Sequence, residues 1–166
     1  MPTFEIRVTG TGPLVTNAAV ATRFDQAVQD TLIGLGQVGH RLVDAKTPVG
    51  VSAGSGGLRG SLFSQLRGTS ARREEIISSA LSYAPIVEVG RHAGRRPPRD
   101  SIALWLTRKI HVPAKDLTRA TFLVARKIGR SGSPGAHMFE QAAAQLGPIV
   151  QQRFQALVDR IESVLE

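Results

Sequence analysis

The side chains of this sequence that could do acid–base or metal chemistry are few and stand far apart. Its four histidines are His40, His92, His111 and His137. None forms a His-x-His or His-Glu-x-x-His pair. The chain has no cysteine, which excludes disulfides and thiolate metal sites. We therefore expect no metal and no other cofactor.

Glu88 is the strongest acidic candidate for a catalytic group, because it precedes a run of arginines. A catalytic carboxylate usually works with a second acid or a metal, and the sequence offers neither. We favour an ion pair between Glu88 and Arg91, Arg95 or Arg126. The serines lack the Gly-x-Ser-x-Gly elbow of a hydrolase nucleophile, and the glycine-rich stretch 50–57 lacks the Gly-Lys-Ser/Thr of a phosphate loop. The sequence thus predicts a protein that is not an enzyme.

The positive charge of the chain, +8 in total, is concentrated in one region. The segment from Arg67 to Arg130 contains 14 basic and 5 acidic residues, a net +9, whereas the rest contains 7 and 8, a net −1. The most basic stretch is the loop 91–99, which we call the arginine loop. Its arginines are Arg91, Arg95, Arg96 and Arg99. Charge gathered in this way predicts a partner surface.

Two kinds of partner fit the arginine loop. Arginines neutralise DNA phosphates without reading sequence. Residues 91–104 contain no Phe, Tyr or Trp, so only His92 could stack on a base, and no helix-turn-helix or RNA-binding signature is present. We therefore do not expect sequence-specific DNA binding. The loop faces either passing DNA or an acidic protein neighbour, and we favour the neighbour because a DNA channel needs only weak attraction.

The first half of the chain predicts one strand and one long helix. Residues 3–9 alternate between apolar and polar, as a half-buried strand does. An apolar stripe of helical period predicts a helix from Leu14 to Ala45, ended by Pro48. An amphipathic helix lying on a sheet is favoured over a coiled coil. Three glycines inside it, Gly34, Gly36 and Gly39, permit close packing or mark a bend.

The second half predicts a small sheet followed by helices. The expected strands are Ser61–Arg67, Glu75–Leu81 and Pro85–Val89, joined by short connections into an antiparallel meander. The expected helices are Ile102–Ile110, Asp116–Ile128 (stopping at Gly129) and Ala136–Glu166, the last interrupted near Gly147-Pro148. The fold class is α+β: an antiparallel β-sheet packed by one long N-terminal helix, with additional C-terminal helices. We expect a single domain over residues 1–166. No signal peptide or membrane span is visible.

Three blocks in this order resemble the tail-completion, or head–tail joining, proteins of long-tailed bacteriophages. The blocks are Gly56-Gly-Leu-Arg-Gly-Ser-Leu62, Tyr83-Ala-Pro-Ile-Val-Glu-Val-Gly90 and the stretch Ala125–Phe139. The family has a Gly-x-Leu-Arg-x-Ser run, a Tyr-Ala-x-x-x-Glu-x-Gly strand end, and an Arg-rich stretch leading to a small-residue turn and an aromatic-led helix. The resemblance covers residues 56 to 140. The positions that carry it are Leu58, Arg59, Tyr83, Glu88, Gly90 and Phe139.

The resemblance implies a structural protein of the virion neck, made in the host bacterial cytoplasm. It implies a ring, most simply of six copies, around the DNA channel, with neighbouring connector, tail-terminator or tail-tube proteins and the passing DNA as partners. Apolar stripes on the first and last helices, which exceed what one small sheet can cover, favour association. His137-Met-Phe-Glu140 departs from the family's Pro-Phe-Leu-Arg-Pro-like run. A basic nucleic-acid-associated protein without sequence specificity is the alternative, and a small-molecule enzyme stays open.

Overall fold

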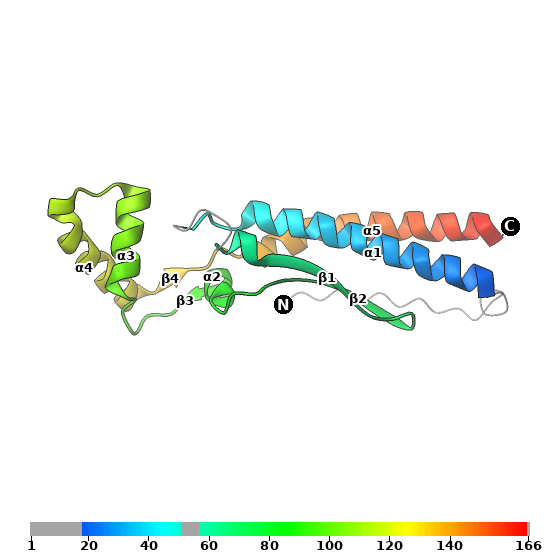
Figure 1. The fold of residues 1–166 in the computed structure, drawn as a ribbon, viewed down its shortest axis with the longest axis horizontal. Helices are drawn as coiled ribbons and strands as arrows, with labels where there is room; N and C mark the ends of the chain where they lie inside the picture. The colour runs from blue at the N-terminus through cyan, green and yellow to red at the C-terminus, as the bar shows by residue number, and fades with distance from the viewer. Residues whose placement is uncertain (1–17, 51–56, 166) are drawn as a thin grey trace. The chain divides into compact units, whose positions relative to one another are not determined.

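The computed structural model describes residues 18–50 and 57–165. The fold is α+β as expected, with a long N-terminal helix, an antiparallel strand pair and further helices towards the C-terminus (Figure 1). Contacts divide the chain into two compact units. The first comprises Met1–Lys46, Leu62–Ser78 and Met138–Glu166, and the second comprises Thr47–Ser61 and Ser79–His137. The strand expected at residues 3–9 and most of the glycine-rich stretch lie outside the described residues, and the single domain stays a prediction.

The first unit is built on two long helices. Helix α1 spans Ala18–Lys46 and α5 spans Met138–Leu165, and the two pack against each other in antiparallel directions (Figure 1). Strands β1 (Leu62–Thr69) and β2 (Arg72–Ser79) form a hairpin whose first strand contacts α1. The predicted long helix is therefore confirmed over its described part, and it lies on a sheet. It also packs on α5, which the sequence did not indicate.

Two of the three glycines of α1 serve close packing. A Cβ atom at Gly36 would collide with the side chains of Glu75 and Ser64, and one at Gly39 would collide with Ile77. Gly34 faces open space, so no neighbouring residue requires a glycine at this position. Glycine destabilises a helix by roughly 1 kcal/mol relative to alanine. At Gly36 and Gly39 this cost accompanies the close approach of α1 and the hairpin.

A half-buried ion pair also fastens the hairpin to α1. The guanidinium of Arg73 on β2 donates through Nε and Nη2 to the two carboxylate oxygens of Asp25 on α1. The side chains are 17% and 32% exposed. A two-point contact of this kind fixes orientation as well as distance, so it sets the register of the hairpin on the helix.

The second unit is centred on a pair of helices. Helix α3 (Arg99–Trp105) continues into a π-helical turn, η2 (Leu106–Ile110), and α4 (Ala114–Ser131) packs back on it. Their core is formed by Ile102, Leu106 and Ala125, and the apolar residues packed around it are Val112, Leu117, Ala120, Val124 and Ile128. Before the helices stand η1 (Arg59–Ser61), α2 (Ala84–Val89) and β3 (Gly90–Arg91), and after them β4 (Ser133–Pro134).

The strand predicted at Pro85–Val89 is wrong, since these residues lie in helix α2. Pro85 stands in the first turn of α2, where a missing N–H removes no helical hydrogen bond. The backbone N–H groups of Ile86 and Val87 both donate to the Tyr83 carbonyl, at 3.0 and 3.1 Å. A segment as short as Pro85–Val89 does not distinguish a strand from a short helix by period alone. The expected meander is therefore a two-stranded hairpin.

Two further helix predictions are also wrong: the end of one helix and the interruption of another. Helix α4 runs through Gly129 and ends at Ser131, and the N–H of the following Gly132 donates to the Ile128 carbonyl at 2.8 Å. Gly132 has φ +72°, a conformation that glycine adopts readily at a helix end. Helix α5 runs through Pro148 without interruption. Proline inside a helix is unfavourable by about 3 kcal/mol, and we attribute its tolerance here to the packing of α5 on α1.

Candidate functional site

Helix α4 separates apolar from basic residues around its axis. Its buried positions, Thr121 and Ala125, lie on the side that packs on α3 and η2. The opposite side carries four cations at intervals of four, seven and four residues, which places them on one helical face. These residues, the α4 basic face, are Lys115, Arg119, Arg126 and Arg130. At 1.5 Å per residue the face is about 22 Å long.

Two apolar side chains interrupt the α4 basic face in its longest gap. Phe122 is 40% exposed and Leu123 is 49% exposed. The guanidinium groups of Arg96 and Arg99 lie 5.8 and 5.9 Å from the centroid of the Phe122 ring. These distances are typical of cation–π contacts. The ring therefore brings the arginine loop against the α4 basic face, and cations from two segments form one surface.

The backbone of the arginine loop is held on α4 as well. The N–H of Gly94 donates to the carbonyl of Gly129 at 2.8 Å. A Cβ at Gly129 would collide with the Cγ of Arg96, so the loop crosses α4 at a position where only glycine leaves room. Within the loop, the Arg91 guanidinium donates to the Arg95 carbonyl. The loop is thus fixed to the helix at both its backbone and its side chains.

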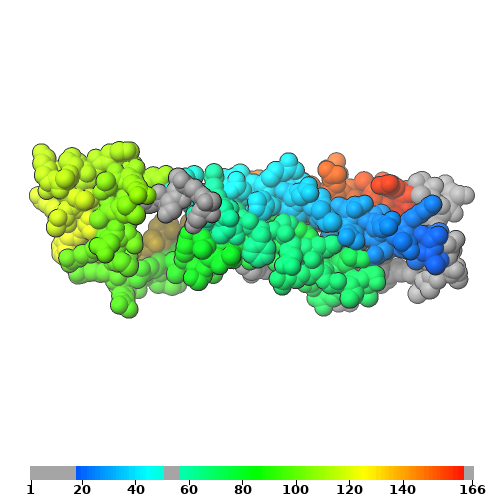
Figure 2. All heavy atoms as spheres, in the orientation of Figure 1, coloured from blue at the N-terminus to red at the C-terminus, as the bar shows by residue number. Residues whose placement is uncertain are grey.

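Cations outnumber acids strongly over residues 91–131. This segment has two acids, Asp100 and Asp116, and eleven basic residues: Arg91, Arg95, Arg96, Arg99, Arg108, Lys109, Lys115, Arg119, Arg126, Lys127 and Arg130. All are exposed except Arg91 and Arg126, which are half-buried. Within residues 18–50 and 57–165, none of the eleven forms an ion pair with an acid. Segment 91–131, green to yellow in the space-filling view, forms one contiguous region there (Figure 2).

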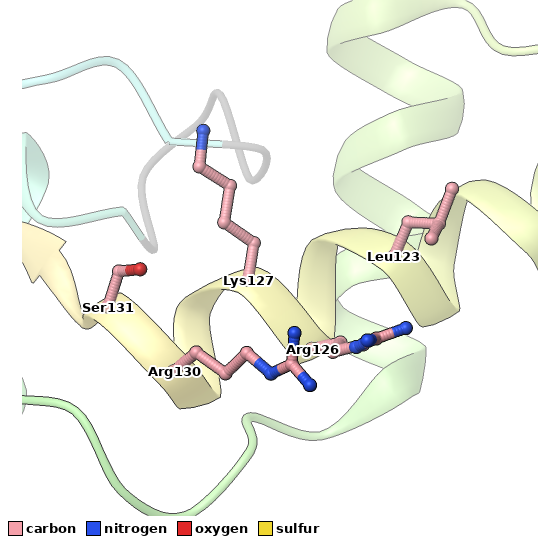
Figure 3. A pocket seen from close by; sticks show the side chains of 5 residues that line it. All are labelled: Leu123, Arg126, Lys127, Arg130 and Ser131. Carbon is pink, nitrogen blue, oxygen red and sulfur yellow. The ribbon is translucent and has the colours of Figure 1, made fainter.

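The last turns of α4 carry an open surface depression of about 250 Å³. Its lining residues all come from this helix: Leu123, Arg126, Lys127, Arg130 and Ser131. Arg126 and Arg130 lie on the same side of the helix, whereas Lys127 points away from them (Figure 3). The side chains that line the depression include three cationic ones, but no acid and no nucleophile–base pair. It can accept an anionic group at the surface, but it does not enclose a substrate.

Two blocks that the sequence singled out meet at strands β3 and β4. Strand β3 pairs antiparallel with β4, with Gly90 opposite Pro134 and Arg91 opposite Ser133. Next to this pair, the N–H groups of Ala136 and His137 donate to the carbonyls of Val87 and Glu88 at 2.8 and 3.0 Å. Glu88 therefore contributes its backbone here, from α2 rather than from a strand. Its predicted ion pair with an arginine stays a prediction.

The remaining residues singled out by sequence are placed as follows. Leu58 is buried, and the Nε of Arg59 donates to the carbonyl of Thr47 at 3.0 Å. Tyr83 precedes α2 and is 44% exposed, so it is not a core aromatic. Phe139 is half-buried in the first turn of α5 and belongs to the other unit.

The described residues contain no group of three or more His, Asp or Glu side chains that could hold a metal ion. None of the described helices combines the length and apolar character needed to cross a membrane. Comparison of the chain with protein-family models, with curated proteins and with solved structures found no match.

Proposed function

We propose that this chain is a structural protein of the phage virion neck that joins the head to the tail. The observation that carries the proposal is the pairing of Tyr83–Gly90 with the end of Ala125–Phe139 through β3 and β4. These two blocks carry much of the resemblance to the tail-completion proteins, and they are separated by a long helical segment in the sequence. Their direct pairing supports a common structural reason for both motifs.

In this role the protein works by surface complementarity and not by turnover. Several copies, six in the simplest case, surround the DNA channel and contact connector, tail-terminator or tail-tube proteins. Such an interface needs exposed, fixed charge and no enclosed pocket. The arginine loop, anchored on α4 at Gly129 and Phe122, is a surface of that kind. Its charge complements either an acidic neighbour or the DNA.

Assembly of particles without the protein tests the proposal. Cells that produce the phage with this gene interrupted should accumulate DNA-filled heads and finished tails that are not joined. Purified protein added to the mixed extract should restore joined particles, which electron microscopy counts directly. Sedimentation of labelled protein with heads alone or tails alone then distinguishes a joining protein from a tail terminator or an adaptor. Normal yields of joined particles in the absence of the protein contradict the proposal.

The arginine loop can be tested within the same assay. We expect the triple change Arg95→Glu, Arg96→Glu and Arg99→Glu to block joining, because it reverses the charge of the surface while altering only exposed side chains. Circular dichroism should show an unchanged helix content. The matched control reverses three exposed arginines of the first unit, Arg23, Arg41 and Arg153, and should join normally. If the loop variant assembles infectious particles at normal yield, the loop has no role in joining.

The unpaired cations of residues 91–131 favour a second candidate, a basic nucleic-acid-associated protein that acts without a virion. Tight binding to random DNA at physiological salt by a monomeric chain, with no defect in particle assembly when the gene is lost, supports this alternative. The first candidate accounts for the motif order as well as for the charge, and we prefer it for that reason.

A further inference from the structure

We propose that the α4 basic face and the arginine loop together bind the phosphate backbone of duplex DNA without reading its sequence. This inference stands on the charges and geometry of the second unit and does not require the neck function. It extends the surface beyond the arginine loop to the exposed face of α4, which sequence patterning alone did not connect to the loop.

The first support is the kind of charge on this surface. Eight of the eleven cations between residues 91 and 131 are arginines, and the segment has only two acids. Arginine is favoured for phosphate recognition because its planar guanidinium donates two parallel hydrogen bonds to phosphate oxygens. Since none of these cations is neutralised by an acid within the described residues, their positive charge is available to an external anion.

The second support is the length of the surface. The α4 basic face extends about 22 Å along the helix axis. Duplex DNA carries one phosphate charge per about 1.7 Å of its axis, so a face of this length passes about 13 phosphates. Each of Lys115, Arg119, Arg126 and Arg130 can therefore meet a phosphate of its own. A short acidic patch on a protein rarely offers charge at this density.

The third support is the residue composition of this surface. The cores of protein–protein interfaces are depleted of charged residues, whereas protein–DNA interfaces are strongly positive. Residues 91–131 contain no Asn or Gln, the side chains that pair with adenine. Phe122 lies beneath two guanidinium groups, where it positions Arg96 and Arg99. The surface therefore lacks the side chains that pair with adenine, and its fixed cations fit contacts to the phosphate backbone.

The salt dependence of DNA binding tests the inference on the full chain. Fluorescence anisotropy should measure the affinity for a random duplex of about 30 base pairs between about 50 and 200 mM salt. The test variant combines Lys115→Gln, Arg119→Gln and Arg130→Gln. The control combines Arg23→Gln, Arg41→Gln and Arg153→Gln, which removes the same charge from exposed positions of the first unit. Circular dichroism and urea unfolding should confirm that both variants are folded.

Each phosphate contact contributes about 0.9 to the slope of log affinity against log salt. We therefore expect the slope of the test variant to fall by roughly 3 in magnitude relative to the unmodified chain, and the slope of the control to remain unchanged. No binding by the unmodified chain at low salt overturns the proposal. An equal loss in both variants also overturns it, because the binding then follows net charge and not this surface.

Competition distinguishes DNA from an acidic protein partner. Polyglutamate at equal charge concentration should displace the duplex poorly, since carboxylates on a flexible chain do not reproduce the phosphate spacing. If polyglutamate competes as well as unlabelled duplex, the surface is an acidic-protein site and the DNA proposal is wrong. Either result leaves the neck function untouched, because that function is tested by joining of heads to tails.

Discussion

At Gly90 the backbone leaves α2 and enters β3 with φ +87° and ψ −170°. This region of backbone conformation is open almost only to glycine. A Cβ at this position would also collide with the carbonyl of Ser133 and with the nitrogen of Gly135 on the opposing segment. The glycine is therefore required twice, by its own dihedral angles and by the approach of β4. The motif that ends in Gly90 has a physical reason that is independent of the function.

We expect Gly90→Ala to lower the free energy of unfolding by about 1–3 kcal/mol, because it adds backbone strain and a collision with β4. Urea unfolding followed by circular dichroism measures the change. Gly34→Ala is the matched control, since Gly34 lies in α1 with nothing within 4 Å of the added Cβ. It should raise the stability by about 0.5–1 kcal/mol through helix propensity. Equal effects of the two changes contradict the assigned role of Gly90.

The site illustrates what single residues do and do not reveal in a sequence. The four arginines of the loop are evident from composition alone. Phe122 is not, because it lies more than twenty residues beyond the loop and contacts Arg96 and Arg99 only after α4 has folded back. The spacing of the cations around Phe122 on α4 was visible in the sequence and is the signal that could have identified the surface.

At the scale of elements, a helix or strand is predicted correctly when its hydrophobic pattern is long and regular. The long helix α1 and the hairpin strands were predicted because their patterns extend over many residues. The short segment Pro85–Val89 was misassigned, since its helix depends on bonds to the Tyr83 carbonyl and on the pairing of the next residues with β4. Helices α1 and α5 are far apart in the sequence, and no local sequence pattern predicts their contact.

Helix α5 allows the stabilising effect of tertiary packing to be compared with the low helix propensity of proline. Pro148 lies inside this helix and is exposed, so its ring fills no core space. We expect Pro148→Ala to stabilise the protein by up to about 3 kcal/mol, because it restores a helical N–H donor and removes a steric conflict with the preceding turn. Thermal unfolding measures the change.

Gln145→Ala, at an exposed position one turn earlier in α5, should change the stability of the protein by less than about 0.5 kcal/mol. If Pro148→Ala destabilises the protein instead, the proline supplies a bend that the contact of α5 with α1 requires. That outcome would replace the view that packing merely tolerates the proline.

At the scale of the whole molecule, the net positive charge is confined to one of the two units. Residues 91–131 carry eleven basic and two acidic residues, a net +9, and the remainder carries ten and eleven, a net −1. The basic segment lies entirely within the second unit. One unit therefore presents the charged surface, while the other is dominated by helix and hairpin packing.

The apolar stripes of the first and last helices do not by themselves favour association, because α1 and α5 pack against each other and so use much of this surface. Among the described residues of the first unit, the large apolar side chains that stay exposed are Ile33, Phe63 and Val158, at 37%, 38% and 45%. Single exposed apolar residues are ordinary on protein surfaces. The expectation of a ring therefore depends on the resemblance to tail-completion proteins and on the charged surface of the second unit.

We expect the protein to occupy the virion neck as a ring of six copies related by rotation, and to form no such ring at the same concentration in solution. A closed ring repeats one heterologous contact, so every copy turns the same surface towards the axis or towards the next protein. Repulsion between the unpaired cations of neighbouring copies opposes ring formation until DNA or an acidic neighbour neutralises them. Light scattering should therefore give a monomer mass for the free chain, and electron cryomicroscopy of the particle should resolve the repeated density. A single copy per virion excludes the ring, and a stable hexamer in solution would show that the cations do not control its assembly.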